Sequence, residues 1–154
     1  MNVKSIALIP ARKGSKGFPF KNRMFFSHTA DFLDEQGWFS RVVVSTDDEV
    51  VAAQARERGY EVHIREPALA GDEISIKSVF VRAARDLSFP GEALLWIFYL
   101  PLVYKRQEDF ARARQIMESG QAESLCGFVP AKTHPYNCWR FDEKSGLSQF
   151  VPND

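Results

Sequence analysis

The sequence has no excess of charge of either sign. Of its 154 residues, 20 are Lys or Arg and 20 are Asp or Glu, so the formal net charge is zero. An overall field that would attract nucleic acid or an anionic membrane is therefore missing. We expect no nucleic acid and no membrane as partners, and any basic site must be local.

Long apolar runs are also missing. The most apolar stretches, Ile6–Ile9 and Leu94–Tyr99, are far too short to span a bilayer, and the amino terminus lacks the apolar stretch and cleavage site of a signal peptide. We therefore expect a cytoplasmic protein. The hydrophobic content of 45% is that of an ordinary globular protein, which predicts a single domain over residues 1–154.

Cysteine and histidine are scarce and scattered. Cys126 and Cys138 fit neither a zinc spacing nor a disulfide framework, which predicts two buried structural thiols. The histidines have no metal-ligand spacing, so surface or packed positions are expected for His28, His63 and His134. Neither Ser-His-Asp nor Cys-His catalysis is indicated.

Strands and helices are predicted to alternate along the chain. Apolar and β-branched runs predict five strands, at Ser5–Ile9, Val42–Ser45, Glu61–Ile64, Ala93–Tyr99 and Ser124–Val129. Alternation with helices implies an α/β fold with a largely parallel sheet covered on both faces. The most apolar strand, Ala93–Tyr99, is expected at the centre of the sheet.

Helix boundaries carry their own signals. Thr46-Asp47-Asp48-Glu49 predicts a capping box in which Thr46 is the cap, and Gly59 is expected to end that helix. Further helices are predicted from Ser75 to about Leu87 and over Glu108–Ser119. Near the end of the chain, a hairpin is predicted between Trp139–Phe141 and Leu147–Phe150.

The densest chemistry follows the first strand, where residues 9–22 read Ile-Pro-Ala-Arg-Lys-Gly-Ser-Lys-Gly-Phe-Pro-Phe-Lys-Asn. Pro10 is predicted to stop the strand, so the polar residues project from the carboxyl end, where open α/β sheets bind ligands. Gly14 and Gly17 are expected to allow a tight turn and to bring N–H groups close to an anion. The segment therefore predicts a phosphate cradle, formed by Arg12, Lys13, Ser15, Lys16, Lys21 and Asn22.

Two better-known phosphate loops do not match. A Walker loop requires Gly-Lys-Ser/Thr at its end, whereas Gly17 is followed by Phe18 and Pro19. A dinucleotide fingerprint opens directly into a helix, but Pro19 and the basic pair Lys21-Asn22 predict an irregular segment here.

The cradle instead resembles the opening motif of the CMP-sugar synthetases, the cytidylyltransferases that activate sialic acids, related nonulosonic acids and Kdo. The motifs that carry the resemblance are Ile9-Pro10-Ala11-Arg12, Gly14-Ser15-Lys16-Gly17, Lys21-Asn22, the run from Arg41 to Glu49, and Ala70-Gly71-Asp72 followed by Ser75. The resemblance extends from Lys4 to about Val81.

This resemblance implies a fold and an activity. The fold would be a three-layer, Rossmann-like nucleotidyltransferase fold of the glycosyltransferase-A-like type, as a single nucleotide-binding domain shorter than typical members. The activity would be transfer of CMP from CTP to an acidic, sialic-acid-like nonulosonic sugar with release of pyrophosphate. Two alternatives stay open: a nucleotide-binding homologue without turnover, and a nucleotidyltransferase that uses another nucleotide and a sugar phosphate.

The resemblance also implies site residues. Catalytic positions would be Arg12, Lys16 and Lys21, and nucleotide contacts would come from these residues and from Gly14, Ser15, Gly17, Asn22 and Ser75. Ser75 is equally suited to capping a helix.

Mg²⁺ is expected by resemblance, without assigned ligands. Asp47 and Asp48 could hold a metal, but the same residues suit a helix start, which is the interpretation favoured here. In relatives the metal-binding aspartates and the dimerisation element belong to a part that would follow Asp154, so metal ligands and a homodimer are left open.

Overall fold

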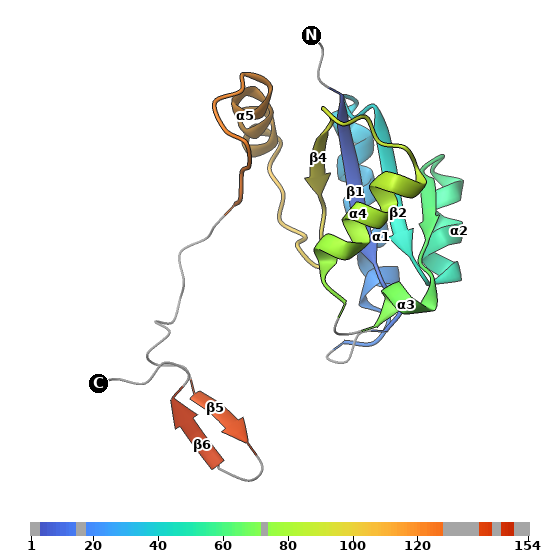
Figure 1. The fold of residues 1–154 in the computed structure, drawn as a ribbon, viewed down its shortest axis with the longest axis vertical. Coiled ribbons are helices and arrows are strands. Elements are labelled where there is room, and N and C mark those ends of the chain that lie inside the picture. Colours follow the sequence, from blue (N-terminus) through green and yellow to red (C-terminus); the bar gives the residue numbers. More distant parts are fainter. Residues whose placement is uncertain (1–3, 15–17, 72–73, 128–138, 143–145, 150–154) are drawn as a thin grey trace. The chain divides into compact units, whose positions relative to one another are not determined.

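The computed structural model describes residues 4–14, 18–71, 74–127, 139–142 and 146–149 (Figure 1). The chain divides into two compact units, Met1–Glu123 and Ser124–Asp154. The first contains a parallel sheet and its helices, and the second contains a hairpin.

The sheet of the first unit has four parallel strands in the order β3-β2-β1-β4. Their bounds are Ser5–Ala11 for β1, Arg41–Thr46 for β2, Glu61–Ile64 for β3 and Leu94–Ile97 for β4. The predicted parallel α/β architecture is therefore confirmed. The predicted central place of the most apolar strand is wrong, because β4 pairs only with β1 among the described strands and leaves Leu95 and Ile97 more than a third exposed.

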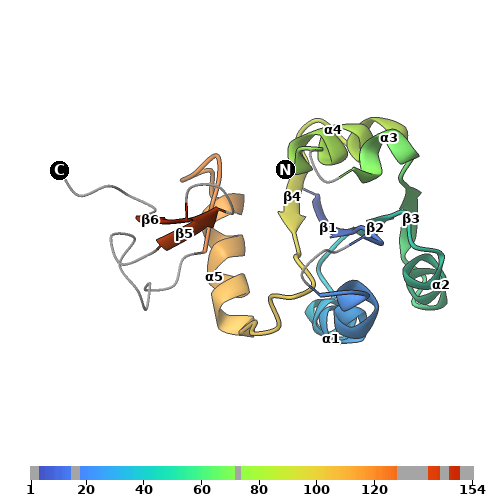
Figure 2. The ribbon, with the colours of Figure 1, turned by 90° about the horizontal axis from the view of Figure 1, so that it is seen from below.

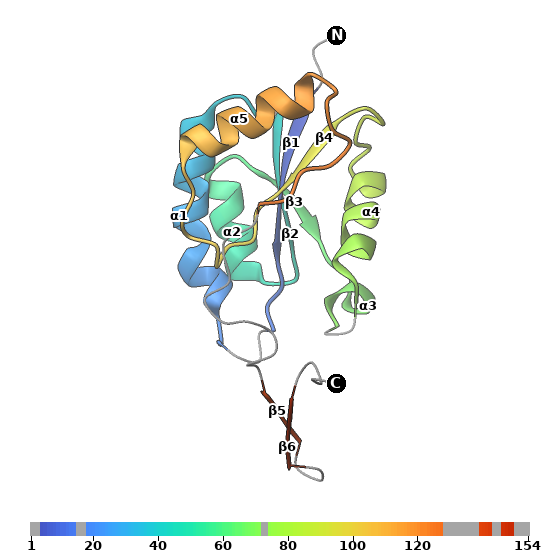
Figure 3. The same ribbon diagram turned by 90° about the vertical axis from the view of Figure 1, so that its left-hand side faces the viewer.

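Helices cover both faces of this sheet, as predicted. Figures 2 and 3 show α1 (Lys21–Gln36) and α2 (Glu49–Glu57) on one face, and α3 (Pro67–Ala70) and α4 (Ile76–Asp86) on the other. Helix α5 (Gln107–Glu118) follows β4 and reaches the α1 side through Phe110, whose ring stacks on Phe98. None of the described helices has the length and apolar character needed to cross a membrane.

The alternation of side chains along β1 builds the two halves of the core. Ala7 and Ile9 face the cluster under α1 and α2, which includes Phe26, Leu33 and Val51. Ile6 and Leu8 face the smaller cluster under α4, with Val43 and Ala83. Because both faces of β1 are buried, its carboxyl end is held firmly at the centre of the sheet edge.

Pro10 does not end the first strand, contrary to the prediction. Pro10 pairs with Ser45 and Ala11 with Thr46 in the parallel register. Proline removes only its own N–H donor, so the pairing can continue past it. At the end of the strand, the carbonyl of Ala11 accepts a hydrogen bond from Oγ1 of Thr46. The strand therefore ends at Ala11, two residues later than predicted, and the cradle residues follow it from Arg12 as expected.

The cap of α2 is also displaced from the predicted position. Asp48 is the N-cap and accepts from the backbone N–H of Val50, whereas Thr46 ends β2 and accepts from the N–H of Asp48. Gly59 has the left-handed φ of 74° expected for a residue that follows a helix end. The predicted helices at residues 75–87 and 108–119 are confirmed as α4 and α5.

The second unit agrees with the sequence in part. β5 (Trp139–Asp142) and β6 (Gly146–Gln149) pair antiparallel, which confirms the hairpin. The predicted strand over residues 124–129 is wrong for residues 124–127, which are not in a strand, and its last two residues lie outside the described part of the chain.

Candidate functional site

Charged residues gather at one edge of the sheet because parallel strands end at the same edge. Arg12 and Lys13 follow β1, Asp47 and Asp48 follow β2, and Arg65 follows β3. This is the edge at which open α/β sheets bind ligands. We describe it as the carboxyl edge.

Hydrogen bonds tie the segment after β1 to its neighbours. The buried Asn22 donates from Nδ2 to the carbonyl of Arg12 at 2.8 Å, and the N–H of Lys13 donates to Oδ1 of Asp47 at 2.7 Å. The side-chain amide of Asn22, a predicted cradle residue, therefore fixes the backbone of the loop through this hydrogen bond. The loop is joined both to the helix after it and to the strand beside it.

Helix α1 begins at Lys21, so the irregular segment predicted for Lys21-Asn22 is wrong. Phe20 takes the cap position with a left-handed φ of 57° and offers no side-chain cap. No acidic residue stands in the first turn. The positive end of the helix dipole and Lys21 therefore lie together at the start of α1, an arrangement that suits an anion. The Lys21 ammonium has no hydrogen bond or ion pair among the described residues.

Gly14 was predicted to allow a tight turn, but its backbone conformation does not require glycine. Its φ is not in the left-handed region, and a Cβ built on it would meet nothing within 4 Å. The backbone conformation alone therefore does not demand glycine. Ser15, Lys16 and Gly17 lie outside the described residues, so their predicted roles in the cradle stay predictions.

Arg65 is a further candidate site residue, which belongs to none of the motifs singled out in the sequence. Its side chain is 6% exposed, its Nε donates to Oγ of Ser45 at 3.0 Å, and its Nη2 has no hydrogen-bond partner among the described residues. Burial lowers the pKa of the guanidinium, Asp47 partly opposes this shift, and the charge of Arg12 adds to it. A buried cation with an unused donor favours an incoming acceptor or anion.

A simple rule could have found Arg65. The rule that selected Arg12, a polar residue directly after a buried parallel strand, applies equally to Arg65 after β3.

Among the described residues, the two aspartates after β2 belong to no cluster that could hold a metal ion. Burial raises the pKa of Asp48, but the hydrogen bonds from Arg23 and from the backbone N–H of Val50 outweigh it and hold that pKa below its ordinary value. No group of three His, Cys, Asp or Glu side chains in the described residues could hold a metal ion. Helix capping, the favoured interpretation, is what the structure shows for Asp48.

Ser75 is the exposed N-cap of α4. Its Oγ accepts from the N–H of Ser78 at 3.1 Å and shares a hydrogen bond of 2.9 Å with Oγ of Ser78. The capping role is thus established, and a nucleotide contact by Ser75 remains a prediction.

Two of the histidines and one of the cysteines lie in the described part of the chain. His63 is buried, while the exposed His28 contacts the carbonyl of Val103 through Nε2. Cys126 is a free thiol, but it is exposed rather than buried as predicted, because residues 124–127 form no strand in a core. His134 and Cys138 lie outside the described residues.

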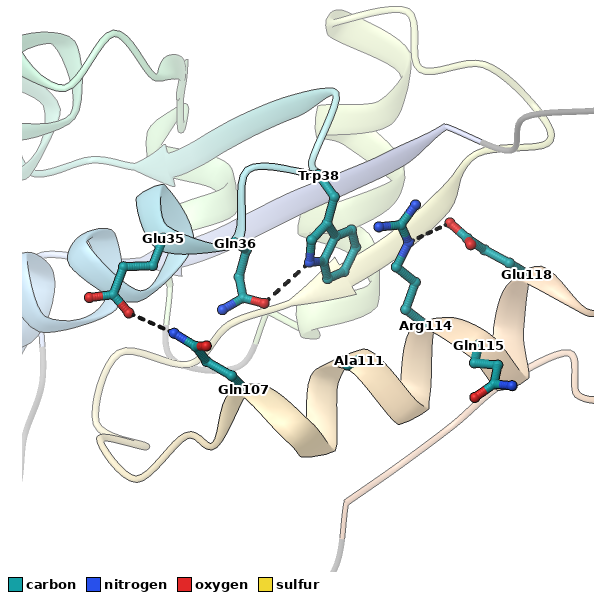
Figure 4. A pocket seen from close by; sticks show the side chains of 8 residues that line it. All are labelled: Glu35, Gln36, Trp38, Gln107, Ala111, Arg114, Gln115 and Glu118. Atoms are coloured by element: carbon teal, nitrogen blue, oxygen red, sulfur yellow. Dashed lines mark hydrogen bonds and ion pairs between the residues drawn. The ribbon is translucent and has the colours of Figure 1, made fainter.

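A hollow of about 470 Å³ lies away from the carboxyl edge, at the other end of α1 (Figure 4). Except for Gln115, the polar side chains that line it are paired with each other: Gln107 donates to Glu35, Trp38 to Gln36, and Arg114 to Glu118. Arg114 also lies 5.0 Å from the centre of a Trp38 ring. With these donors and acceptors already satisfied, this hollow offers a polar ligand little, and we assign it no role.

Comparison with known proteins identifies relatives of this chain. The family model described as Cytidylyltransferase matches residues 6–88. The chain is 31% identical over 141 residues to the N-acylneuraminate cytidylyltransferase of Streptococcus agalactiae serotype V, and 36% identical over 81 residues to the enzyme of that name from Escherichia coli O18:K1:H7. These matches cover 86% and 49% of this chain, respectively.

The same comparison shows how much of each relative is represented. The chain spans 34% of the length of the Streptococcus protein and 19% of the Escherichia protein. A solved structure of CMP:2-keto-3-deoxy-manno-octonic acid synthetase complexed with CTP superposes with a TM-score of 0.63 at 20% identity, covering 77% of this chain and 49% of that one. This likeness supports the nucleotidyltransferase-type fold implied by the sequence.

Proposed function

The chain belongs to the cytidylyltransferase family, and from this premise we propose that it binds CTP at the carboxyl edge of its sheet. In the proposed reaction it transfers CMP to a hydroxyl group of an acidic, sialic-acid-like sugar and releases pyrophosphate. The relatives named N-acylneuraminate cytidylyltransferase support the choice of sugar class. The likeness to a structure complexed with CTP supports the choice of nucleotide.

The observation that carries this proposal is the convergence of cations and donors at one edge. Within the cradle, Lys21 stands at the positive end of α1, and Arg12 directly follows the central strand β1. A triphosphate carries several negative charges and needs such a combination of fixed cations and N–H donors.

The chemistry assigned to these residues is positioning and charge stabilisation. When the sugar oxygen attacks the α-phosphorus, the bond to the bridging oxygen breaks and negative charge grows on the departing pyrophosphate. Arg12 and Lys21, with Lys16 by resemblance, are proposed to bind the β- and γ-phosphates and to stabilise this charge. Ser15, Gly14 and Gly17 are proposed to add backbone or hydroxyl donors.

Arg65 is proposed to bind a different part of the same nucleotide. β3 lies two strands from β1, a separation of about 10 Å at the usual strand spacing. An extended nucleotide whose phosphates lie at the cradle can reach along the edge to the unused Nη2 donor. Ser75 is proposed on the base or ribose side by resemblance.

Mg²⁺ is proposed only as the ion that accompanies CTP, as in other phosphoryl-transfer sites. The described residues provide no carboxylate cluster to hold it, since Asp48 is committed to Arg23 and Val50. No step is therefore assigned to a protein-bound metal.

Calorimetry of the 154-residue chain with CTP, UTP, ATP and GTP tests the nucleotide, and pyrophosphate release with acidic sugars tests the reaction. Preference for CTP with sugar-dependent release supports the proposal. CTP binding without release under any sugar would favour the nucleotide-binding homologue. Preference for another nucleotide, with release driven by a sugar phosphate, would favour the third candidate.

A further inference from the structure

A chain of hydrogen bonds, buried except for its last link, connects Arg65 at the carboxyl edge to Asp86 on α4. Nε of Arg65 lies 3.0 Å from Oγ of Ser45, this oxygen lies 2.9 Å from Nδ1 of His63, and Nε2 of His63 lies 3.2 Å from Oδ2 of Asp86. Ser45 and His63 are opposite each other in the register of β2 and β3. The connection therefore crosses two strands and ends on a helix.

The direction of each hydrogen bond follows from the chemistry of the groups. The Nε–H of arginine can only donate, so Ser45 Oγ accepts from Arg65 and its own proton is available for Nδ1 of His63. The carboxylate of Asp86 can only accept, so Nε2 of His63 carries the proton that faces it, and in this neutral tautomer Nδ1 accepts from Oγ of Ser45. Arg82 also donates to both oxygens of Asp86 and lowers the pKa of this carboxyl, with a smaller contribution from His63.

Ser45, His63 and Asp86 are the residue types of a Ser-His-Asp catalytic triad, but they cannot act as a catalytic triad here. Ser45 is completely buried, so no substrate reaches its oxygen. That oxygen also accepts from Arg65, and His63 uses Nδ1 toward the serine and Nε2 toward the aspartate. The group therefore orients a neighbour rather than attacking a substrate.

The neighbour that it orients is Arg65. A guanidinium is planar, so fixing the direction of Nε–H also fixes the direction of Nη2, the atom without a partner among the described residues. We propose that His63, acting through Ser45 and anchored by Asp86, is a positioning residue that holds Arg65 in the orientation in which Nη2 meets the nucleotide. This proposal rests on the proposed function, because it requires CTP at the carboxyl edge.

The consequence is preorganisation. An arginine with free rotamers would lose side-chain entropy when it bound the nucleotide, whereas Arg65 is already ordered. Breaking the link at His63 should therefore weaken CTP binding without removing any group that touches CTP.

A double-mutant cycle on the 154-residue chain tests this, with CTP affinity measured by calorimetry. Arg65→Met keeps the stem and removes the donors, and we expect it to weaken binding by about tenfold or more, the usual scale for a hydrogen bond from a charged group. His63→Leu should weaken binding by about threefold to tenfold in the unsubstituted chain and have no further effect in the Arg65→Met chain.

A conservative variant separates positioning from simple packing. In His63→Asn the amide oxygen can stand near the position of Nδ1 and accept from Ser45, so most of the affinity lost in His63→Leu should return. Ser45→Ala, a small change that removes the same link, should resemble His63→Leu and serves if the leucine variant does not fold. Melting temperatures recorded for all variants identify any that are unfolded.

Several outcomes would overturn the inference. It fails if His63→Leu or Ser45→Ala leaves CTP affinity unchanged, if the histidine substitution is equally harmful with and without Arg65, or if the asparagine variant restores nothing. If the unsubstituted chain binds CTP and Lys21→Ala weakens binding while Arg65→Met does not, the proposed function stands and this inference falls. If the unsubstituted chain binds no CTP, both fall.

Discussion

Nε of Arg23 lies 2.8 Å from Oδ2 of Asp48, and this ion pair joins the first turn of α1 to the residue that caps α2. The Arg23 guanidinium also lies 4.4 Å from the centre of the Phe20 ring, next to the left-handed backbone at the start of α1. One side chain thus connects the helix that carries Lys21 to the end of strand β2. The geometry of the candidate site depends on this contact, although neither partner is proposed to touch the nucleotide.

We expect Arg23→Ala to lower the free energy of unfolding at neutral pH by about 1–3 kcal/mol, the usual cost of leaving a buried polar group without its partner. Asp48 is 2% exposed and would keep only its backbone hydrogen bonds. Urea denaturation measures the change. The matched control is Arg85→Ala, an exposed arginine on α4 without a side-chain partner among the described residues, which should change stability by less than about 0.5 kcal/mol.

The pH dependence of the same pair has a definite sign. Because the pKa of Asp48 is lowered in the folded state, its contribution to stability is present above the ordinary carboxyl pKa and is lost as pH falls through the folded value. In Arg23→Ala the effect of burial remains, which raises the pKa of Asp48. The stability difference between the two proteins should therefore shrink from about pH 5 to about pH 3. A difference that grows on acidification would contradict this account.

Lys21→Ala should weaken CTP binding, because it removes a cation from the end of α1 that faces the cradle. The expected loss is about 1–3 kcal/mol, as for a hydrogen bond to a charged group. Calorimetry with CTP measures it, and Lys4→Ala is the matched control, since Lys4 precedes β1 at the opposite edge of the sheet. Unchanged CTP affinity in the Lys21 variant would remove this residue from the site.

Preference for cytosine is expected to depend on the segment around Ser75. A base that leaves a buried donor or acceptor without a partner costs about 1–3 kcal/mol, so CTP should bind more tightly than UTP. Ser75→Asn keeps a good helix cap, so we expect little change in melting temperature but a smaller ratio of CTP to UTP affinity. Equal affinities of the unsubstituted chain for CTP and UTP would rule out this role.

Removal of Mg²⁺ should affect turnover far more than binding in this chain. The groups described at the carboxyl edge that suit a triphosphate are cations and N–H donors, and no carboxylate cluster accompanies them. Interactions that are equal in the ground and transition states give affinity without rate. CTP affinity and sugar-dependent pyrophosphate release should be measured on one preparation with and without EDTA. Abolition of CTP binding by EDTA would contradict this expectation.

The sequence predicted the four strands of the parallel sheet and the place of the cations that follow β1, because these depend on local patterns. The β-branched run of β2 and the apolar run of β1 are both buried in a parallel sheet, and the cations after β1 lie at its carboxyl edge. The order in which the strands pair could not be predicted from the sequence. The edge position of β4 and the lack of a strand at residues 124–127 depend on which segments pair, and composition does not encode pairing.

The start of α1 and the burial of Arg65 are two further features that could not be predicted from the sequence. The sequence has no capping residue before Lys21 that would predict a helix start there. Phe20 occupies the cap position, in a backbone conformation that few non-glycine residues adopt. The place of Arg65 directly after a parallel strand could have been predicted from the sequence, but its surroundings could not. Its burial and its unused donor become visible only when Ser45 and His63 are placed beside it.

The position of β4 has a practical consequence for the protein in solution. Among the described strands β4 pairs only with β1, no described strand pairs with the backbone groups on its other side, and the side chains of Leu95 and Ile97 are exposed. Such an edge can template pairing with a second chain. We therefore expect concentrated samples of this chain to self-associate through β4, which sedimentation at rising protein concentration measures, and we expect Ile97→Lys to reduce this association.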